Sequence, residues 1–121
     1  MALLQVDFFS EVLGMCTQMS VILPQRTSRQ IGMTGTVREG KYPAVFLLHG
    51  MTDDHTTWCR RTSIERYVSE LGIAVIMPEV QLGWYTDTKY GMRYQTFLCR
   101  ELPGICREFF PNISDRKEDI L

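Results

Sequence analysis

Two kinds of hydrophobic pattern predict the strands of a sheet. Residues 3–9 and 15–24 place apolar side chains at roughly alternating positions, as half-buried strands do, and Gly14 is available for the turn between them. Residues 44–49 (AVFLLH) and 73–78 (IAVIMP) are instead continuous apolar runs, which are typical of strands covered on both faces in a parallel sheet. We therefore expect an antiparallel strand pair followed by two parallel strands.

A helix is predicted between the two continuous runs. Apolar residues recur there at positions i, i+3, i+4 and i+7, a spacing that puts them on one face of a helix. They are Ile64, Tyr67, Val68 and Leu71. Gly72 follows and is expected to end the helix. Strand, helix and strand in this order predict one right-handed crossover between parallel strands.

A second helix is predicted over residues 92–110. Its apolar stripe consists of Leu98, Leu102, Ile105, Cys106 and Phe109. Pro103 lies inside the stripe and has no N–H to bond to the carbonyl of Cys99, so we expect a kink or a break there. Beyond Pro111 a charged turn (114–119) is followed by two apolar residues, which we expect to begin a further strand.

Length and charge narrow the class of protein. A chain of 121 residues is expected to hold one domain at most. Its 13 basic and 14 acidic residues are scattered along the chain and leave a net charge of -1, so we expect no nucleic-acid partner. No run of about 18 apolar residues exists, and no basic segment opens the chain, so we expect no membrane span, no secretory signal and a cytoplasmic location.

No residue has the sequence setting of a catalytic nucleophile. A serine hydrolase of the α/β type needs the motif G-x-S-x-G, and none of the serines at positions 10, 20, 28, 63, 69 and 114 has a glycine two residues away. The cysteines at positions 16, 59, 99 and 106 lack the spacing of redox or zinc motifs, so we expect small buried residues in a reducing compartment. Glycine-rich phosphate loops are absent as well. We expect the attacking group to lie outside this chain.

The His49-Gly50 pair, directly after the first continuous run, is the main candidate for chemistry. In α/β serine hydrolases a loop after a core strand donates one backbone N–H to the oxyanion hole, and glycine lets the backbone approach a substrate oxygen. The donor would be the N–H of Met51. The alternative is that the pair only marks the end of a strand. We expect the ring of His49 to bond to neighbouring backbone rather than to act as a general base.

The same loop contains a weak candidate for a metal site. His55 follows Asp53 and Asp54, but no further ligand stands at helical spacing, and one histidine beside two carboxylates matches no metal site well. We therefore expect a solvated loop and no metal.

Three aromatic residues are candidates for lining a substrate pocket together with His49. Trp58 either packs in the core or borders a pocket. Trp84 and Tyr85 belong to GWYTDTKYG, a loop that follows the second continuous run, at the end of a sheet where open α/β folds bind ligands. The alternative for this loop is that its aromatic side chains cap the core.

The joint pattern resembles a known family. FLLHGMTDDHTTWCRRTSIERY, then IAVIMPEVQLGWYTDTKYG, then ELPGICREFFPNISDRKED, in this order and spacing, are similar to the esterase D family of α/β-hydrolases. The subgroup with the greatest resemblance is that of the tributyrin-esterase-like carboxylesterases, which are relatives of S-formylglutathione hydrolase. The resemblance extends over nearly the whole chain and is weakest in residues 25–42.

The resemblance implies a fold of the α/β class and an activity. Residues 1–121 would be the N-terminal, incomplete portion of a single α/β-hydrolase domain, in which an antiparallel strand pair is followed by parallel strands with crossover helices. The fold would be truncated before the nucleophile strand. The family hydrolyses short acyl esters or thioesters with a Ser-His-Asp triad and without metal or organic cofactor. The triad would lie beyond Leu121.

Only part of the family's site transfers to this chain. Gly50 and Met51 match the oxyanion loop, and Trp58, Trp84 and Tyr85 match positions near the mouth of the active site. The family pattern leaves two other possibilities open: a non-catalytic truncated paralogue that retains binding alone, and an acyltransferase that uses the same oxyanion geometry.

The family's strand order has a further implication. The nucleophile strand lies beside the strand that matches residues 44–49, so without it those residues form an exposed apolar sheet edge. We therefore expect self-association through this edge, or oligomerisation of the full-length enzyme, in addition to the small acyl-ester substrate.

Overall fold

The computed structural model describes residues 1–37, 39–81, 93–116 and 120. Within them the strands are β1 (Ala2–Ser10), β2 (Met15–Leu23), β3 (Ala44–Phe46) and β4 (Ala74–Pro78). They form one sheet in the order β1-β2-β4-β3. β2 is antiparallel to both β1 and β4, whereas β3 and β4 are parallel. The predicted antiparallel pair and the two parallel strands are confirmed.

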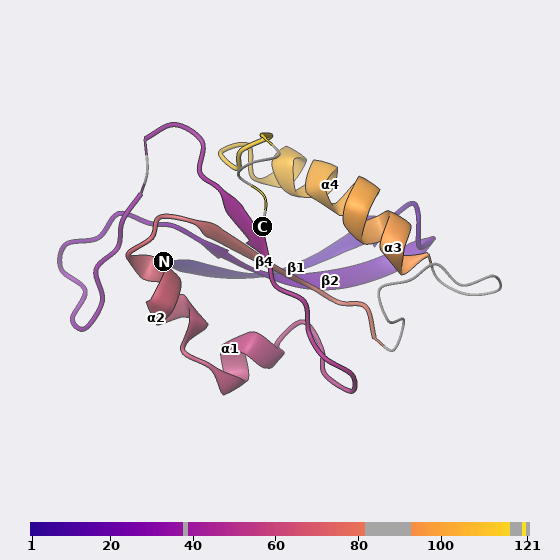
Figure 1. Ribbon diagram of the computed structural model, residues 1–121, viewed down its shortest axis with the longest axis horizontal. Helices are drawn as coiled ribbons and strands as arrows, with labels where there is room; N and C mark the ends of the chain where they lie inside the picture. The colour runs from indigo at the N-terminus through magenta and orange to yellow at the C-terminus, as the bar shows by residue number, and fades with distance from the viewer. Residues whose placement is uncertain (38, 82–92, 117–119, 121) are drawn as a thin grey trace.

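Helices lie on both faces of this sheet (Figure 1). The helices α1 (Thr57–Arg61) and α2 (Ile64–Ser69) connect β3 to β4 on one face. A continuous helical stretch covers the other face and consists of α3 (Tyr94–Thr96), η1 (Phe97–Glu101) and α4 (Leu102–Phe109). This α/β architecture is the one expected from the sequence.

Strand β4 divides its side chains between two hydrophobic clusters. Ala74 and Ile76 belong to the larger cluster, which includes Phe97 and Leu102 from the η1–α4 stretch. Val75 and Met77 belong to the smaller cluster under α1 and α2. All five residues of β4 are buried, as the continuous apolar run predicts.

The single helix predicted between β3 and β4 is wrong in part. The chain forms two short helices, because the hydroxyl of Thr62 donates to the carbonyl of Trp58 and accepts the N–H of Ile64 at 3.2 Å. Such local side-chain bonds compete with the helical backbone bonds. A helix as short as α2 buries little of the expected stripe, and Tyr67 and Leu71 remain 67% and 50% exposed.

The second predicted helix contains an irregular turn at the expected place. Residues Phe97–Glu101 form a π-helical turn in which the N–H of Leu102 bonds to the carbonyl of Phe97, five residues earlier. Pro103 follows at once, inside the first turn of α4. The π-turn shifts the carbonyls that a proline ring would otherwise meet, so the helix continues through Pro103.

β3 is the edge strand of the sheet, and its outer side is partly paired. Tyr42 forms a parallel bridge with Ile113, and Ala44 forms one with Ile120. The predicted start of a further strand at Ile120 is therefore present as a single bridge. β3 itself is less buried than β4, because its second neighbour is confined to these contacts.

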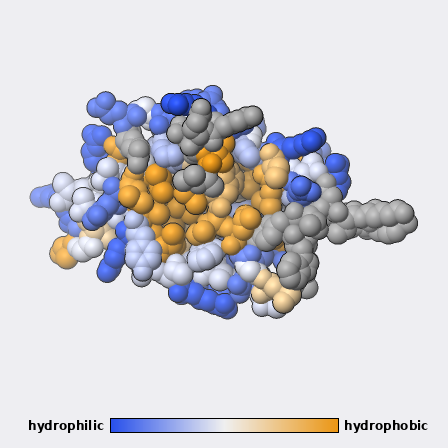
Figure 2. Space-filling model, viewed as in Figure 1, coloured by the Kyte–Doolittle hydropathy of each residue, from blue (hydrophilic) through white to orange (hydrophobic). Residues whose placement is uncertain are grey.

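An apolar groove of about 790 Å³ opens beside this edge. Phe46 and Leu48 border it on the sheet side, and Leu98 and Pro103 border it on the helical side. Leu48 is 40% exposed. Figure 2 shows apolar residues gathered across the middle of this face, between polar upper and lower margins. Among the described helices, none combines the length and the apolar character needed to cross a bilayer.

The turn of the β1–β2 hairpin is attached to the helical layer by Glu101. The carboxylate of Glu101 accepts the hydroxyl of Ser10 and the backbone N–H groups of Glu11 at 3.0 Å and Val12 at 3.2 Å. The hydroxyl oxygen of Ser10 in turn accepts the N–H of Leu13 at 3.0 Å. One side chain therefore satisfies most of the polar groups of this turn.

Replacing Glu101 by alanine should destabilise the fold. Hydrogen bonds to a charged group are worth roughly 1.5–3 kcal/mol, so we expect a loss of about that size in the free energy of unfolding. Urea denaturation followed by circular dichroism measures it. Glu108→Ala is the matched control, because Glu108 is exposed on the same helix. Equal stabilities of the two variants would contradict the role given to Glu101.

Candidate functional site

Two loops meet at the carboxyl ends of the parallel strands. The first, residues 47–56, leaves β3 and leads to α1, and the second begins at Glu79 after β4. In open α/β sheets this end of the parallel strands is where ligands bind. Trp84 and Tyr85 of the second loop lie outside the described residues, so their predicted place in a pocket stays a prediction.

Gly50 begins a tight turn in the first loop. Its carbonyl oxygen accepts the N–H of Asp53 at 3.1 Å and lies 2.8 Å from Nδ1 of His49. Thr52, inside the turn, has a left-handed φ of 67°. A Cβ on Gly50 would approach the carboxylate of Asp53 to 3.3 Å, so glycine keeps this turn uncrowded.

Met51 is an exposed residue of that turn. Its exposed fraction is 63%, and among the described residues no hydrogen-bond partner is found for its N–H. A backbone N–H held in a fixed turn and left without an internal partner is suited to bind an anionic oxygen. The assignment of Gly50 and Met51 to an oxyanion hole stays a prediction.

The ring of His49 bonds to backbone on two sides. Nε2 lies 3.1 Å from the N–H of Val80, and Nδ1 lies 2.8 Å from the carbonyl oxygen of Gly50. Val80 can only donate, so Nε2 accepts and Nδ1 carries the proton. The carboxylate of Glu79 is 3.4 Å from Nε2, which in this neutral tautomer is a contact and not a hydrogen bond. The sequence prediction that this ring holds the loop in shape is confirmed.

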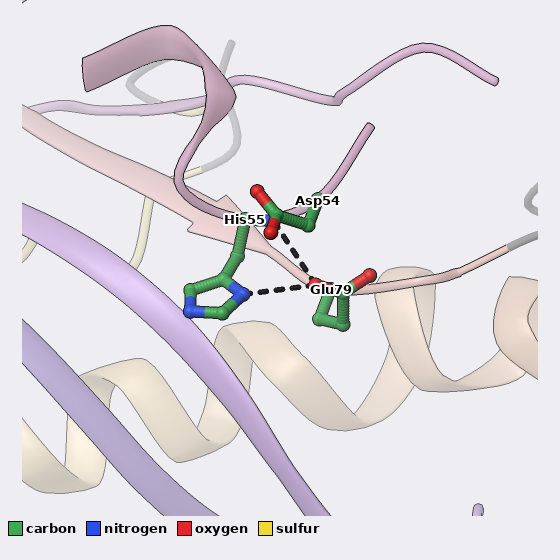
Figure 3. A group of neighbouring side chains, drawn as sticks. All are labelled: Asp54, His55 and Glu79. Atoms are coloured by element: carbon green, nitrogen blue, oxygen red, sulfur yellow. Dashed lines mark hydrogen bonds and ion pairs between the residues drawn. The ribbon is translucent and has the colours of Figure 1, made fainter. Parts of the chain in front are cut away.

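Glu79 connects the two loops. Its Oε2 accepts the backbone N–H of His55 at 3.0 Å and lies 2.8 Å from Nδ1 of the same residue (Figure 3). Its Oε1 accepts the N–H of Gln81 at 2.9 Å. Burial alone would raise the pKa of Glu79, but the hydrogen bonds from His55 and Gln81 outweigh burial and lower it. Glu79 is therefore a buried carboxylate that stays ionised.

The solvated loop predicted around His55 is wrong in one respect. The side chain of His55 is only 15% exposed, and its Nδ1 is hydrogen-bonded to Glu79. Sequence reasoning missed Glu79, which directly follows Pro78 at the end of β4. The available signal was an acidic residue placed at the end of a continuous apolar strand.

Donor atoms of Asp54, His55 and Glu79 all lie within 4.8 Å of one another, which is close enough for a shared metal ion (Figure 3). Some of their lone pairs are already engaged in hydrogen bonds, however. One oxygen of Asp54 accepts the N–H of Thr56 at 2.9 Å and its hydroxyl at 2.6 Å, and these bonds lower the pKa of Asp54. Three ligands are also fewer than the four of structural zinc sites. The group fits a hydrogen-bond network better than a metal centre.

Trp58 fixes the start of the first loop. Its indole N–H donates to the carbonyl of Leu48 at 3.0 Å, and its ring packs against the smaller hydrophobic cluster with Ile22 and Val75. Trp58 is thus partly buried against the core, and its predicted place near a substrate pocket stays a prediction.

The buried serine hydroxyls of Ser20 and Ser69 are engaged in hydrogen bonds, and the buried thiol of Cys106 is protonated. Ser20 donates to Gln5 at 2.8 Å, and Ser69 donates to the carbonyl of Arg66 at 2.9 Å. Burial raises the pKa of the Cys106 thiol to about 12 despite the nearby Arg107. A thiol with that pKa supplies almost no thiolate at neutral pH.

The prediction that all four cysteines are buried is wrong for two of them. Cys16 and Cys99 are exposed, whereas Cys59 is half-buried and Cys106 is buried. Cys99 borders the apolar groove beside β3, within the π-turn.

Comparisons with solved structures show which proteins share this geometry. The serine hydrolase F of Staphylococcus aureus, a fluorophosphonate-binding enzyme, is 34% identical with a TM-score of 0.82. An S-formylglutathione hydrolase from the same organism is also 34% identical, with a TM-score of 0.77. Each match covers 98% of this chain and 45% of the other. The chain is therefore similar, over nearly its whole length, to S-formylglutathione hydrolases and related serine hydrolases, as the sequence resemblance implies.

A more distant solved structure shares the fold. An S-formylglutathione hydrolase from Agrobacterium tumefaciens shares the fold at 20% identity, with a TM-score of 0.76 over 91% of this chain and 44% of its own. The chain thus spans somewhat less than half the length of these hydrolases. The sequence matches no family model and no curated protein sequence.

The thiols should differ in reactivity according to their positions. At pH 8 in native buffer, iodoacetamide should label the exposed Cys16 and Cys99 first and leave Cys106 unmodified until denaturant is added. Peptide mass spectrometry after timed quenching measures the order. Labelling of Cys106 as fast as that of Cys16 would contradict the packing described for the helical layer.

Proposed function

We propose that this chain is part of a serine carboxylic-ester hydrolase and that its first loop supplies one oxyanion-hole donor, the N–H of Met51. The observation that carries the proposal is the exposed turn at the carboxyl end of β3, which begins at a glycine whose carbonyl is held by His49. The 34% identity to two S. aureus hydrolases supports the reaction class.

The chemistry of ester hydrolysis explains why a fixed N–H is useful. When a nucleophile adds to the acyl carbon, negative charge moves onto the carbonyl oxygen. A donor that is already oriented stabilises this charge more strongly in the transition state than in the ester. Gly50 has no side chain that would keep an acyl group away from the donor.

The nucleophile, acid and base would come from a segment outside the described residues. We place the strand that leads to the nucleophile on the outer edge of β3, where Ala44 already pairs with Ile120 in parallel. A strand in that position would end beside the loop of residues 47–56, because parallel strands end on the same side of a sheet. The apolar groove beside Phe46 and Leu48 would receive its side chains.

Short acyl esters or thioesters are the proposed substrates, as for the tributyrin-esterase-like group. Support for thioesters comes from the S. aureus structure named S-formylglutathione hydrolase. A second candidate function is a non-catalytic remnant that binds esters or a partner. It is favoured by one observation: buried hydroxyls such as those of Ser20 and Ser69 are engaged, and the Cys106 thiol is protonated.

The 121-residue chain alone should show no serine-dependent turnover. We expect p-nitrophenyl acetate to be hydrolysed no faster than with an equal amount of denatured chain. A serine-directed fluorophosphonate should leave any residual rate unchanged. Turnover that the fluorophosphonate abolishes would mean that a nucleophile is present in this chain.

A chimaera distinguishes an enzyme part from a remnant. Residues 1–121 should replace the equivalent segment of the S. aureus S-formylglutathione hydrolase and retain esterase activity. In this chimaera Met51→Pro removes the proposed N–H donor, and we expect kcat to fall by about 100- to 1000-fold. Met51→Ala keeps the N–H and is the matched control. Equal kcat values for the two variants would exclude Met51 as an oxyanion donor.

The isolated chain should associate with itself through the edge of β3. Leu48 is 40% exposed beside that edge, and an unpaired apolar edge is a template for strand pairing. Light scattering after size exclusion should show dimers or larger species, and Leu48→Lys should shift them toward monomer. Leu71→Lys is the control, because Leu71 is 50% exposed on another surface. A compact monomer at all concentrations would contradict this proposal.

A further inference from the structure

We propose that Glu79 is the positioning residue of the loop over residues 49–55. It would fix both ends of that loop on the end of β4 and so set where the N–H of Met51 stands. This inference rests on the function proposed above. It concerns a residue that touches no substrate and acts through its neighbours.

The far end of the loop is fixed directly. One carboxylate oxygen of Glu79 accepts the backbone N–H of His55 at 3.0 Å (Figure 3). The same oxygen lies 2.8 Å from Nδ1 of the His55 ring. Because His55 makes both bonds, they fix both the position and the orientation of this residue. Glu79 is 9% exposed, so water competes little for these bonds.

The near end of the loop is fixed through the residues that follow Glu79. The other carboxylate oxygen of Glu79 accepts the N–H of Gln81 at 2.9 Å, which closes a turn over residues 79–81. This turn orients the N–H of Val80 toward Nε2 of His49, at 3.1 Å. The opposite nitrogen of that ring holds the carbonyl of Gly50 at 2.8 Å. The contacts thus form one chain from Glu79 to the residue before Met51.

Backbone strain indicates that such a support is needed. Thr52 and Gln81 adopt left-handed φ values of 67° and 49°, and they are the non-glycine residues with positive φ in the described part of the chain. Conformations of this kind persist only where surrounding contacts enforce them, and they occur often at active sites. One lies in the loop that Glu79 holds, and the other donates its N–H to Glu79.

The remaining charged contacts of the loop are weaker candidates for this role. Arg61 pairs with Asp53 at 3.0 Å and Arg60 with Asp54 at 3.6 Å, but the two arginine side chains are 63% and 59% exposed. Exposed ion pairs contribute little, because water and salt screen them. Of the charged contacts described for this loop, the one made by the buried carboxylate of Glu79 is therefore the strongest candidate for the positioning role.

Hydrogen exchange and NMR on the full 121-residue chain test the inference without any activity. In Glu79→Ala, exchange of the hydrogen-bonded amides of residues 53–55 should become at least about tenfold faster, as expected from losing bonds to a charged group. Amides of β4 at residues 75–77 should keep their rates. The hydrogen-bonded Nδ1–H resonance of His55 should be lost. Glu70→Ala is the matched control, because Glu70 is exposed on the neighbouring connection.

A second variant covers the case in which Glu79→Ala fails to fold. His55→Phe removes the ring donor but keeps the backbone N–H, and it should raise exchange of the amides of residues 53–55 by a smaller factor. In the chimaera described above, Glu79→Gln should lower kcat with little change in KM, since the substrate is not touched.

The outcomes separate this inference from the proposed function. Unchanged exchange of the loop in both variants would overturn the role of Glu79, whatever Met51→Pro does. A full kcat for Glu79→Gln beside a reduced kcat for Met51→Pro would overturn it while leaving the oxyanion donor in place. Equal kcat values for Met51→Pro and Met51→Ala would remove the proposed function and this inference with it. Stoichiometric binding of zinc alone that shifts the His55 resonances would overturn it as well, because the group would then be a metal site.

Discussion

The complete burial of β4 is the constraint on which the rest of the structure depends. This strand pairs on one side with β2 and on the other with β3, and its side chains enter both hydrophobic clusters. If β4 shifted by one residue, Val75 would turn toward the larger cluster and Ile76 toward the smaller one. Each side chain would then face the helices of the opposite layer. The register of β4 is thereby fixed, and so is the place of Glu79 and Val80 at its end. Core packing outside the candidate site therefore fixes the positions of these two site residues.

The sheet could be predicted from the sequence because its signal is local. Alternating positions in residues 3–9 and 15–24 and the continuous runs after them were sufficient to assign strand type and direction. The helices were harder to predict than the strands. The apolar stripe that contains Tyr67 and Leu71 predicts a helix but not where that helix begins and ends. Thr62 separates α1 from α2 with two side-chain bonds just before that stripe, and a pattern of hydrophobic positions does not reveal such bonds.

The candidate site was predictable only in the part that a short motif carries. His49 and Gly50 stand out because they end an apolar run, and the role of the His49 ring followed from its neighbours in the chain. Glu79 and His55 are 24 residues apart, and their contact exists only because β4 ends beside the loop that leaves β3. Family resemblance suggested the reaction class, but it pointed to no residue at the end of β4.

The π-turn and Pro103 form a coupled pair. A residue adds about 100° of rotation to a helix, so the extra residue in η1 changes which side chains of α4 face the sheet. Deleting one residue there would restore regular α-helical bonding before Pro103. It would also bring the proline ring against the carbonyl of Cys99 and turn Leu102 and Cys106 out of the larger cluster. The insertion and the proline must therefore be gained or lost together in any descendant of this chain.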